Sequence, residues 1–441
     1  MTHSVANSAE LNRRPGRMLR KVEGKNRRRR QNHDEPIRLL IMIPIVPPAF
    51  SGAGQRGWRM ARGFKKMGLE VKVVTYTRQA PTSDDVPVAR VRGWTWRSMF
   101  PRGSIRRKVA GGVGAVVSVA EIWQVIRRHR TDLVFQIGCD LGPQLAGAAS
   151  LLSRTPFIAE ATLAGSDDAL TIQQGSRGAF RFRLLRAAEL VTHVSPRLAE
   201  AGLKAGLSRS QIRTIGNEVD TEHFKPLSRE AKRRLRSDLK LPQSGLVYIS
   251  VGAIIARKGI LPVVRAFHEA VSGDQTSHLI LVGPAPEGPY LDELRDTVTA
   301  LGLEGRVRMT GAVPDAAPWM QASDVFVFAS REEGFGTVLP EAMAVGLPVV
   351  VREIPMITRY IVGEVPGVRI VPDDEDLAGA MVDVQRFVRN EDISIQLRRR
   401  VIDKFADHVI YERYVKLFQE CIESKETAST GVEDPRDLDG A

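Results

Sequence analysis

Residues 324–351 read DVFVFASREEGFGTVLPEAMAVGLPVVV: a short apolar run, a glycine-rich loop, a helix-like stretch and a second apolar run. The apolar runs at 324–328 and 347–351 predict strands. Gly346 ends the helix-like stretch and Pro348 follows it, as is usual at a helix C-terminus. The stretch therefore predicts a strand–helix–strand unit of a parallel sheet.

Similar units precede this stretch. Further strands of the same series are expected at 246–251, 279–282 and 307–309. An earlier series opens at 39–43, which is apolar on both faces as a central parallel strand must be, and continues with a helix from Gly52 to about Met67 and a strand at 71–74. Two such series predict an α/β protein of two Rossmann-like domains facing across a cleft.

The domain boundaries follow from changes in composition. We predict a disordered basic tail at 1–36, a first Rossmann-like domain at 37–222, a second at 223–405, a closing helix at 406–423 and a disordered tail at 424–441. The linker is expected near 217–226, where the chain becomes polar and reaches a proline.

Composition narrows the function classes. The chain has 441 residues, 43% of them hydrophobic, which is enough to bury two cores. Its two cysteines, Cys139 and Cys421, are far apart and in no metal-ligand spacing, so a reducing, cytoplasmic setting fits. The start is polar and basic, and no stretch reaches about 18 uninterrupted apolar residues, so we expect no membrane span. The net charge of +13 favours anionic surfaces without choosing among lipid, nucleic acid and phosphorylated substrate.

The loop at 333–341 carries the strongest functional signal. In open parallel sheets, ligands bind beyond the carboxyl ends of the strands. Gly334 and Gly336 let backbone N–H groups approach a ligand, and the following helix N-terminus offers unpaired donors to a phosphate or hydroxyl. Glu333 and Glu341 can accept hydrogen bonds from the vicinal hydroxyls of a sugar and a ribose. Alternatively both acids only favour the positive helix end, which does not explain the Gly-Phe-Gly sequence.

This segment resembles a known family. Residues 329–348, with Glu333 and Glu341 separated by seven residues and followed by Ala342-Met343-Ala344-Val345-Gly346-Leu347-Pro348-Val349, look like the hallmark of the family-4 retaining glycosyltransferases of GT-B fold. The resemblance covers about 37–419. It implies that Glu341 holds the ribose and Glu333 the transferred sugar. The backbone groups expected to bind the sugar and diphosphate are those of Gly334, Phe335, Gly336, Thr337, Val338 and Leu339.

The resemblance also implies the partners. The first domain would face the acceptor, a glycan or lipid-linked molecule, and the second would bind a UDP- or GDP-sugar. The nucleotide sugar is a substrate, so no cofactor is expected, and such enzymes generally need no bound metal. The implied role is polysaccharide biosynthesis.

A second loop, at 252–259, reads GAIIARKG and carries cations. Lys258 can neutralise charge that grows on a leaving nucleoside diphosphate. The family usually has an arginine directly after the first glycine, Gly252, but here that residue is Ala253. Arg257 is the candidate substitute, starting from a different point of the loop. The alternative is that Lys258 is an ordinary surface cation.

Two loops of the first half complete the candidate site. Gly52 and Gly54 open the first helix and resemble the family's glycine-rich loop near the donor phosphate and the acceptor, although a helix start needs no ligand. In the segment 162–168, TLAGSDD, Ala164 stands where the family has a histidine that contacts the donor sugar. Either Asp167 or backbone groups replace it, or activity has been lost. Asp167 and Asp168 could also be a helix-capping pair.

Two other stretches are less specific. Asn217-Glu218-Val219-Asp220 resembles the family's hinge signature, with Glu218 where glycine is usual, and we interpret it as structural. In 90–108, RVRGWTWRSMFPRGSIRRK, aromatics interleaved with arginines suit an anionic membrane surface. They would also suit stacking on single-stranded nucleic acid, or a solvated loop.

The preferred hypothesis is an active retaining glycosyltransferase, cytoplasmic and peripheral to the inner face of a membrane. Ala164 and Ala253 favour the alternative of a silent GT-B subunit that scaffolds or activates another glycosyltransferase. Glu333, Glu341 and Lys258 favour activity. A nucleotide-sugar epimerase of similar fold is a third possibility. Nucleic-acid binding comes last, because only the basic tail supports it.

Overall fold

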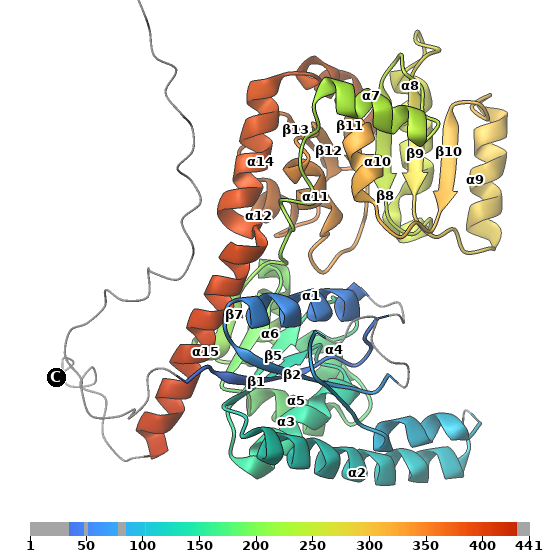
Figure 1. Ribbon diagram of the computed structural model, residues 1–441. Helices are drawn as coiled ribbons and strands as arrows, with labels where there is room; N and C mark the ends of the chain where they lie inside the picture. Colours follow the sequence, from blue (N-terminus) through green and yellow to red (C-terminus); the bar gives the residue numbers. More distant parts are fainter. Residues whose placement is uncertain (1–34, 48–51, 78–84, 102, 430–441) are drawn as a thin grey trace, which may run out of the picture. The chain divides into compact units, whose positions relative to one another are not determined.

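The computed structural model of the chain describes residues 35–47, 52–77, 85–101 and 103–429. The predicted tails at 1–36 and beyond Ser429 lie almost wholly outside these residues, so their predicted disorder is untested. The described residues form two sheets, both entirely parallel, one in each half of the sequence (Figure 1).

The first sheet has seven strands in the order β3-β2-β1-β4-β5-β6-β7. The strands are β1 Arg38–Met42, β2 Glu70–Thr75, β3 Val88–Arg90, β4 Leu133–Ile137, β5 Phe157–Ala161, β6 Leu190–His193 and β7 Ile212–Thr214. The connecting helices are α1 Gly52–Lys66, α2 Ile105–His129, α3 Leu141–Ser153, α4 Ala169–Gln174, α5 Gly178–Arg186 and α6 Pro196–Lys204, with the 3-10 helices η2 Gly93–Met99 and η3 Arg209–Gln211.

The second sheet has six strands in the order β10-β9-β8-β11-β12-β13. The strands are β8 Val247–Val251, β9 His278–Val282, β10 Val307–Gly311, β11 Val325–Phe328, β12 Val349–Arg352 and β13 Val368–Val371. The helices of this half are α7 Arg229–Asp238, α8 Ile260–Ala270, α9 Pro289–Ala300, α10 Ala317–Ala322, α11 Val338–Ala344, α12 Thr358–Val362, α13 Leu377–Asp383, α14 Glu391–Phe405 and α15 Asp407–Ser429, with η4 Ala256–Lys258 and η5 Val384–Phe387.

Both sheets have the strand order of the Rossmann fold, which confirms the predicted fold class. The order reverses beside the first strand of each sheet: β1 lies between β2 and β4, and β8 lies between β9 and β11. Ligands of such sheets bind beyond the carboxyl ends of the strands at this reversal. The loops that follow β8 and β11 are therefore the natural walls of a binding site in the second half.

The predicted strands at 39–43, 71–74, 246–251, 279–282, 307–309, 324–328 and 347–351 correspond to β1, β2, β8, β9, β10, β11 and β12, with ends shifted by at most two residues. The predicted first helix is α1. The other strands of the first sheet and β13 were not predicted individually. The domain boundary at 222/223 falls in the segment between β7 and α7 and stays a prediction.

The closing helix is longer than predicted. α15 packs against α1 of the first half (Figure 1), where Tyr411, Tyr414 and Phe418 surround the ring of Phe64 at centroid distances of 5.4, 6.0 and 5.3 Å. The helix continues to Ser429, so the prediction of a disordered tail from 424 is wrong for its first residues. This last part of the helix is tied to the first half through Lys425, which pairs with Glu189 at 2.7 Å.

The chain passes between the two halves twice, and the two crossing segments are joined. Val219, in the predicted hinge, forms a parallel bridge with Ala406, at the junction of α14 and α15. The Val219 N–H donates to the Phe405 carbonyl at 2.8 Å, and the Asp407 N–H donates to the Val219 carbonyl at 3.1 Å. Backbone pairing thus ties the hinge to the return crossing.

Candidate functional site

The loops after β8 and β11 lie against each other, as expected for neighbours in the sheet. The Lys258 Nζ donates to Glu333 Oε1 at 2.5 Å, and both side chains are largely buried. Arg257 donates to the carbonyl of Glu332 at 2.9 Å and lies 3.9 Å from Glu333 Oε2, with 44% of its side chain exposed. The two predicted loops therefore meet, and the charge of Glu333 is paired with that of Lys258.

The glycine-rich segment after Glu333 offers unused backbone donors. The N–H groups of Phe335, Gly336 and Thr337 donate to no protein group in the part of the chain that the structure describes. The predicted donor N–H of Leu339, by contrast, is already bonded to the Gly336 carbonyl at 2.9 Å. The Phe335 ring is buried, so this residue can contribute to a ligand site only through its backbone.

Glu341 lies in the first turn of α11, close to these donors in sequence. No described residue forms a hydrogen bond or an ion pair with its carboxylate. Burial raises the pKa of Glu341 to about 8, against an opposing effect from Arg59 and with further raising effects from Glu218 and Asp315. A carboxylate in protein surroundings without a partner is costly, so its oxygens are available to a hydrogen-bonding ligand.

Asp167, predicted as catalytic, holds its own loop. Its carboxylate accepts hydrogen bonds from the N–H groups of Thr162, Leu163 and Cys139 and from the Thr162 hydroxyl, at 2.6 to 3.4 Å. Burial nevertheless raises the pKa of Asp167 to about 6. With its oxygens occupied in this way, the geometry favours a positioning role over the predicted catalytic one.

Asp168 caps a helix, as the structural alternative for this pair proposed. It is the N-cap of α4 and accepts from the Thr171 N–H at 3.0 Å and the Thr171 hydroxyl at 2.6 Å. Its second interaction is with the Gly165 N–H at 2.7 Å, which closes the turn after Ala164. The two aspartates together fix the shape of the segment 162–168.

This fixed loop touches the glycine-rich loop of the second half. A Cβ atom added to Gly334 would lie 2.2 Å from the carbonyl oxygen of Thr162, a distance that no side chain allows. A Cβ atom on Gly165 would lie 3.8 Å from a carboxylate oxygen of Glu332. Gly334 is therefore required because the two backbones approach so closely, in addition to any contact with a ligand.

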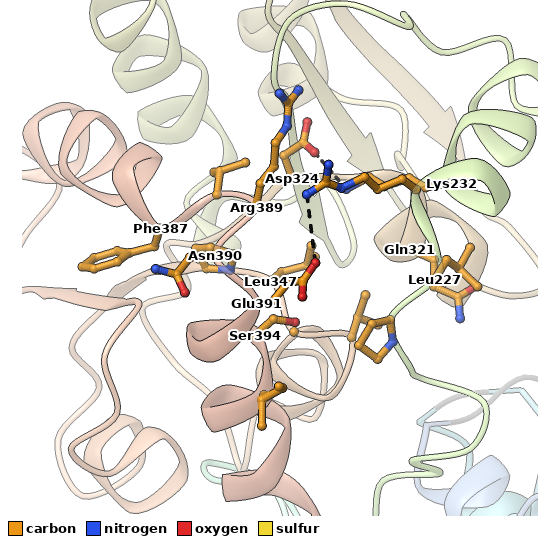
Figure 2. Close-up of a pocket in the computed structure, with 17 residues that line it drawn as sticks. Leu227, Lys232, Gln321, Asp324, Leu347, Phe387, Arg389, Asn390, Glu391 and Ser394 are labelled. Carbon is orange, nitrogen blue, oxygen red and sulfur yellow. Dashed lines mark hydrogen bonds and ion pairs between the residues drawn. The ribbon is translucent and has the colours of Figure 1, made fainter. Parts of the chain in front are cut away.

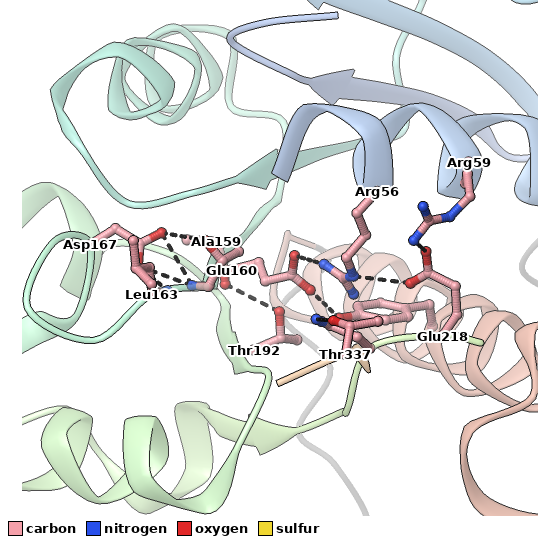
Figure 3. Close-up of polar contacts among 12 residues, drawn as sticks. Arg56, Arg59, Ala159, Glu160, Leu163, Asp167, Thr192, Glu218 and Thr337 are labelled. Atoms are coloured by element: carbon pink, nitrogen blue, oxygen red, sulfur yellow. Dashed lines mark hydrogen bonds and ion pairs between the residues drawn. The ribbon is translucent and has the colours of Figure 1, made fainter. Parts of the chain in front are cut away.

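The predicted glycine loop of the first half leads into a buried charge network. Gly52 begins α1 with open space around it, and Gly54, two residues further on, is buried. Along the same helix, Arg56 binds both Glu160, at the end of β5, and Glu218, in the hinge, while Arg59 binds Glu218 at 3.2 Å (Figure 3). Two cations face two buried carboxylates, so the charges balance.

Most of this network was not predicted from the sequence. Glu218 was interpreted as structural, and its burial and its two arginine partners agree with that. Arg59 and Glu160 were not singled out. The available signal was the spacing of Arg56 and Arg59, which places both on one face of a helix.

The hinge also contacts the predicted donor loop. Asn217 Nδ2 donates to the Thr337 hydroxyl at 2.9 Å, which links a predicted site residue to the hinge. The Asn217 Oδ1 is buried and has no partner among the described residues. A change of angle between the crossing segments would therefore reach the glycine-rich loop directly.

A cavity of about 380 Å³ lies elsewhere in the second half (Figure 2). It opens near the amino ends of β11 and β12, and no predicted site residue lines it. Four of its charged groups pair with each other: Lys232 with Asp324 at 2.8 Å, and Arg229 with Glu391 at 4.0 Å. The cavity therefore lies at the amino ends of the strands, whereas the candidate site lies at their carboxyl ends.

Two family models match the chain on either side of the hinge. Residues 51–218 match the model described as glycosyl transferase 4-like domain, and residues 245–386 match the model described as glycosyl transferases group 1. Together these matches cover well over half of the chain and include both halves of the candidate site. The chain belongs to the group 1 glycosyltransferase family. The family-4 assignment is consistent with the first of these models.

Two curated relatives of this group 1 chain are named for lipopolysaccharide core biosynthesis. The lipopolysaccharide core biosynthesis glycosyltransferase LpsD of Rhizobium meliloti is 33% identical over 143 residues, which is 32% of this chain and 40% of LpsD. LpsE of the same organism is 28% identical over 242 residues, 54% of this chain and 66% of LpsE. The chain thus spans less than two thirds of the length of each.

Solved structures confirm the GT-B fold. The Anabaena protein HepE, crystallised with UDP and glucose, matches with a TM-score of 0.68 over 87% of this chain and 99% of HepE, at 21% identity. At that identity the likeness establishes the architecture of the group 1 chain, while its substrates are a separate question.

Proposed function

We propose that this chain is a retaining glycosyltransferase that moves a sugar from a UDP- or GDP-sugar to a glycan or lipid-linked acceptor. The observation that carries the proposal is the Glu341 carboxylate, which has no protein partner and lies one helical turn from three unused backbone donors. An unsatisfied acid beside unsatisfied N–H groups suits a molecule that carries both hydroxyls and a diphosphate.

In the proposed reaction, the acceptor hydroxyl attacks the anomeric carbon on the face from which the diphosphate leaves. The new bond joins the acceptor oxygen to that carbon, the bond from the carbon to the phosphate oxygen breaks, and the hydroxyl proton passes to the departing phosphate. No protein nucleophile is needed. Lys258 stabilises the charge that develops on the diphosphate, and Glu333, which holds Lys258, binds the transferred sugar.

The partners are proposed from the relatives. HepE was crystallised with UDP and glucose, which supports a UDP-sugar as donor. LpsD and LpsE are named for lipopolysaccharide core biosynthesis, which supports a glycan acceptor carried on a lipid. We propose a cytoplasmic location because Cys139 and Cys421 are both free and buried.

A silent subunit that scaffolds another glycosyltransferase is the second candidate, because Ala164 and Ala253 replace two polar residues of the family pattern. Mass spectrometry of the purified chain after incubation with a panel of UDP- and GDP-sugars separates the two. Release of a nucleoside diphosphate from one donor, lost in Glu341→Ala, is the expected result. Binding of a donor without any hydrolysis or transfer, with every acceptor tried, would favour the silent subunit.

A further inference from the structure

Helix α2 has one side that the fold uses and one that it does not. Its buried residues, Gly114, Ser118, Ile122 and Ile126, recur every fourth position and face η2 and α3 (Figure 1). Among the residues that the structure describes, α2 is the helix long and apolar enough to cross a membrane, with a mean hydropathy of 1.7 over its most apolar window and only 22% of that window buried.

The opposite side of α2 exposes large apolar side chains. Ile105 is 78% exposed, Val109 60%, Val113 50%, Val116 71% and Trp123 38%. At about 100° per residue, these positions fall within an arc of about 80°, roughly opposite the buried positions. A continuous apolar stripe of this kind on a surface helix marks an interaction site.

The exposed part of η2 adds to this stripe. Trp96 is 37% exposed and Met99 is 68% exposed, and η2 packs along α2. We call these seven residues the α2 face: Trp96, Met99, Ile105, Val109, Val113, Val116 and Trp123.

Charges near the α2 face are positive and lie at its ends. Arg106 and Lys108 flank the stripe at the start of the helix, and Arg127 and Arg128 follow it at the end. No charged residue occurs between Val109 and Ala120. The acid of the helix, Glu121, points to the other side, where it accepts from the N–H groups of Arg92 and Gly93.

We propose that the α2 face docks on an anionic lipid membrane, with α2 lying in the plane of the interface. Apolar side chains would enter the acyl boundary, the tryptophans would lie at headgroup level, and the terminal cations would meet lipid phosphates. A spanning orientation is disfavoured because it would break the packing of α2 on η2 and α3 and the bonds of Glu121. The proposal extends the docking surface expected at 90–108 along the helix to Trp123.

Membrane docking is independent of the donor site, so its test needs no catalysis. The full chain is mixed with vesicles of phosphatidylcholine, with and without phosphatidylglycerol, and the bound fraction is measured by flotation. The wild type is expected to float with the anionic vesicles. Val109→Glu/Val116→Glu should reduce the bound fraction at least about ten-fold, because two carboxylates would enter the interface.

The matched control is Val382→Glu/Ile395→Glu, which adds the same charge at two exposed apolar positions of α13 and α14, 50% and 61% exposed, and should bind as the wild type does. Any one of four results would overturn the proposal. One is a wild type that does not float. Another is an equal loss of vesicle binding in both double variants. A third is vesicle binding that survives in Val109→Glu/Val116→Glu and is abolished by salt alone, which would assign the binding to exposed cations. The last is a lipid-free oligomer that the α2 variant dissociates, which would make this face an interface between copies of the chain.

Discussion

Two acids of the candidate site are in opposite states: Asp167 is buried, and Glu341, in the first turn of α11, is partly exposed. In the loop at 162–168, the Asp167 carboxylate accepts from four protein donors, three backbone N–H groups and a hydroxyl. In the segment at 330–341, the Glu341 carboxylate has no partner among the described residues. Burial raises the pKa of both. A raised pKa therefore does not separate a scaffold acid from a ligand acid, whereas the number of satisfied oxygens does.

Glu333 lies between Asp167 and Glu341 in this comparison, because it has one close charged partner, Lys258. Replacing Lys258 should give the largest effect on the reaction. Lys258→Ala removes the cation proposed to stabilise the diphosphate and leaves Glu333 with only the distant Arg257. We expect turnover to fall about 100- to 1,000-fold, measured as nucleoside diphosphate released at saturating donor. Glu333→Ala should also lower turnover more than it changes the donor Michaelis constant. Unchanged turnover in both variants would remove the pair from the reaction.

Asp167→Asn tests the scaffold side of the comparison. The amide that replaces one oxygen turns a donor toward N–H groups that need an acceptor, so the segment 162–168 should loosen. We expect a loss of about 2–4 kcal/mol in the free energy of unfolding, followed by chemical denaturation. The donor Michaelis constant of the folded fraction should change little. A stable variant with greatly reduced turnover would instead restore the predicted catalytic role of Asp167.

Glu341→Gln should show the reverse pattern. It keeps the shape of the side chain and removes a charge that no described group balances, so stability should not fall. The donor Michaelis constant should rise about 10- to 100-fold, since a charged acceptor of hydroxyl groups is lost. Isothermal titration with the nucleoside diphosphate and with the free nucleoside would locate the lost contact. A Michaelis constant like that of the wild type would contradict a ribose role for Glu341.

The segments around Glu341 and Asp167 also show what the sequence could predict. The motif around Glu341 gave the donor segment, and Asp168 was recognised as one possible cap. The contact that joins the loops was not predicted, because Gly334 and Thr162 are far apart in the chain and meet only through the folded halves. The same holds for Arg59 and Glu218, whose pairing explains why a glutamate is tolerated where the family has glycine.

The missed strands have a similar cause. β5 reads Phe157-Ile-Ala-Glu-Ala161, and its Glu160 argues against a buried strand in a reading of periodicity. In the structure Glu160 is completely buried, because its carboxylate is bound by Arg56 of α1 and by the Tyr414 hydroxyl of α15, two helices that are far apart in the sequence. β7 has only three residues, too few for any periodic signal. Strong apolar runs such as β1 and β8 were predicted because their burial requires no partner.

The pH dependence of donor binding sharpens the comparison further. Only the ionised form of Glu341 is a pure acceptor, so with a pKa of about 8 the donor Michaelis constant should fall about ten-fold between about pH 7 and about pH 9. Glu341→Gln should remove this dependence. The sign for stability is opposite. Because the pKa in the folded chain is above the usual 4.5, the ligand-free wild type should lose stability as the pH rises from about 4.5 to about 8, and the loss should level off above that.

That loss should be absent in Glu341→Gln, so the difference between the unfolding midpoints of the two proteins should be constant below about pH 4.5 and change progressively up to about pH 8. Midpoints that run parallel over the whole range would mean that the pKa of Glu341 is not raised in the folded chain, and the contrast with Asp167 would weaken accordingly.

Arg257→Ala should have the smallest effect. Arg257 is the candidate substitute for the arginine that the family has at position 253, but it is 44% exposed and makes its close contact with a carbonyl, that of Glu332. An exposed charge is screened, so we expect the donor Michaelis constant to rise only about two- to five-fold, with a stronger effect at low salt. Ala253→Arg in the same background would restore the family pattern from the other side of the loop. If Arg257 binds the diphosphate, Ala253→Arg should compensate for the loss of Arg257. If Lys258 and the backbone donors suffice to bind it, neither change should alter the donor Michaelis constant. In that case the free N–H groups at 335–337 would explain why the chain does without the family arginine.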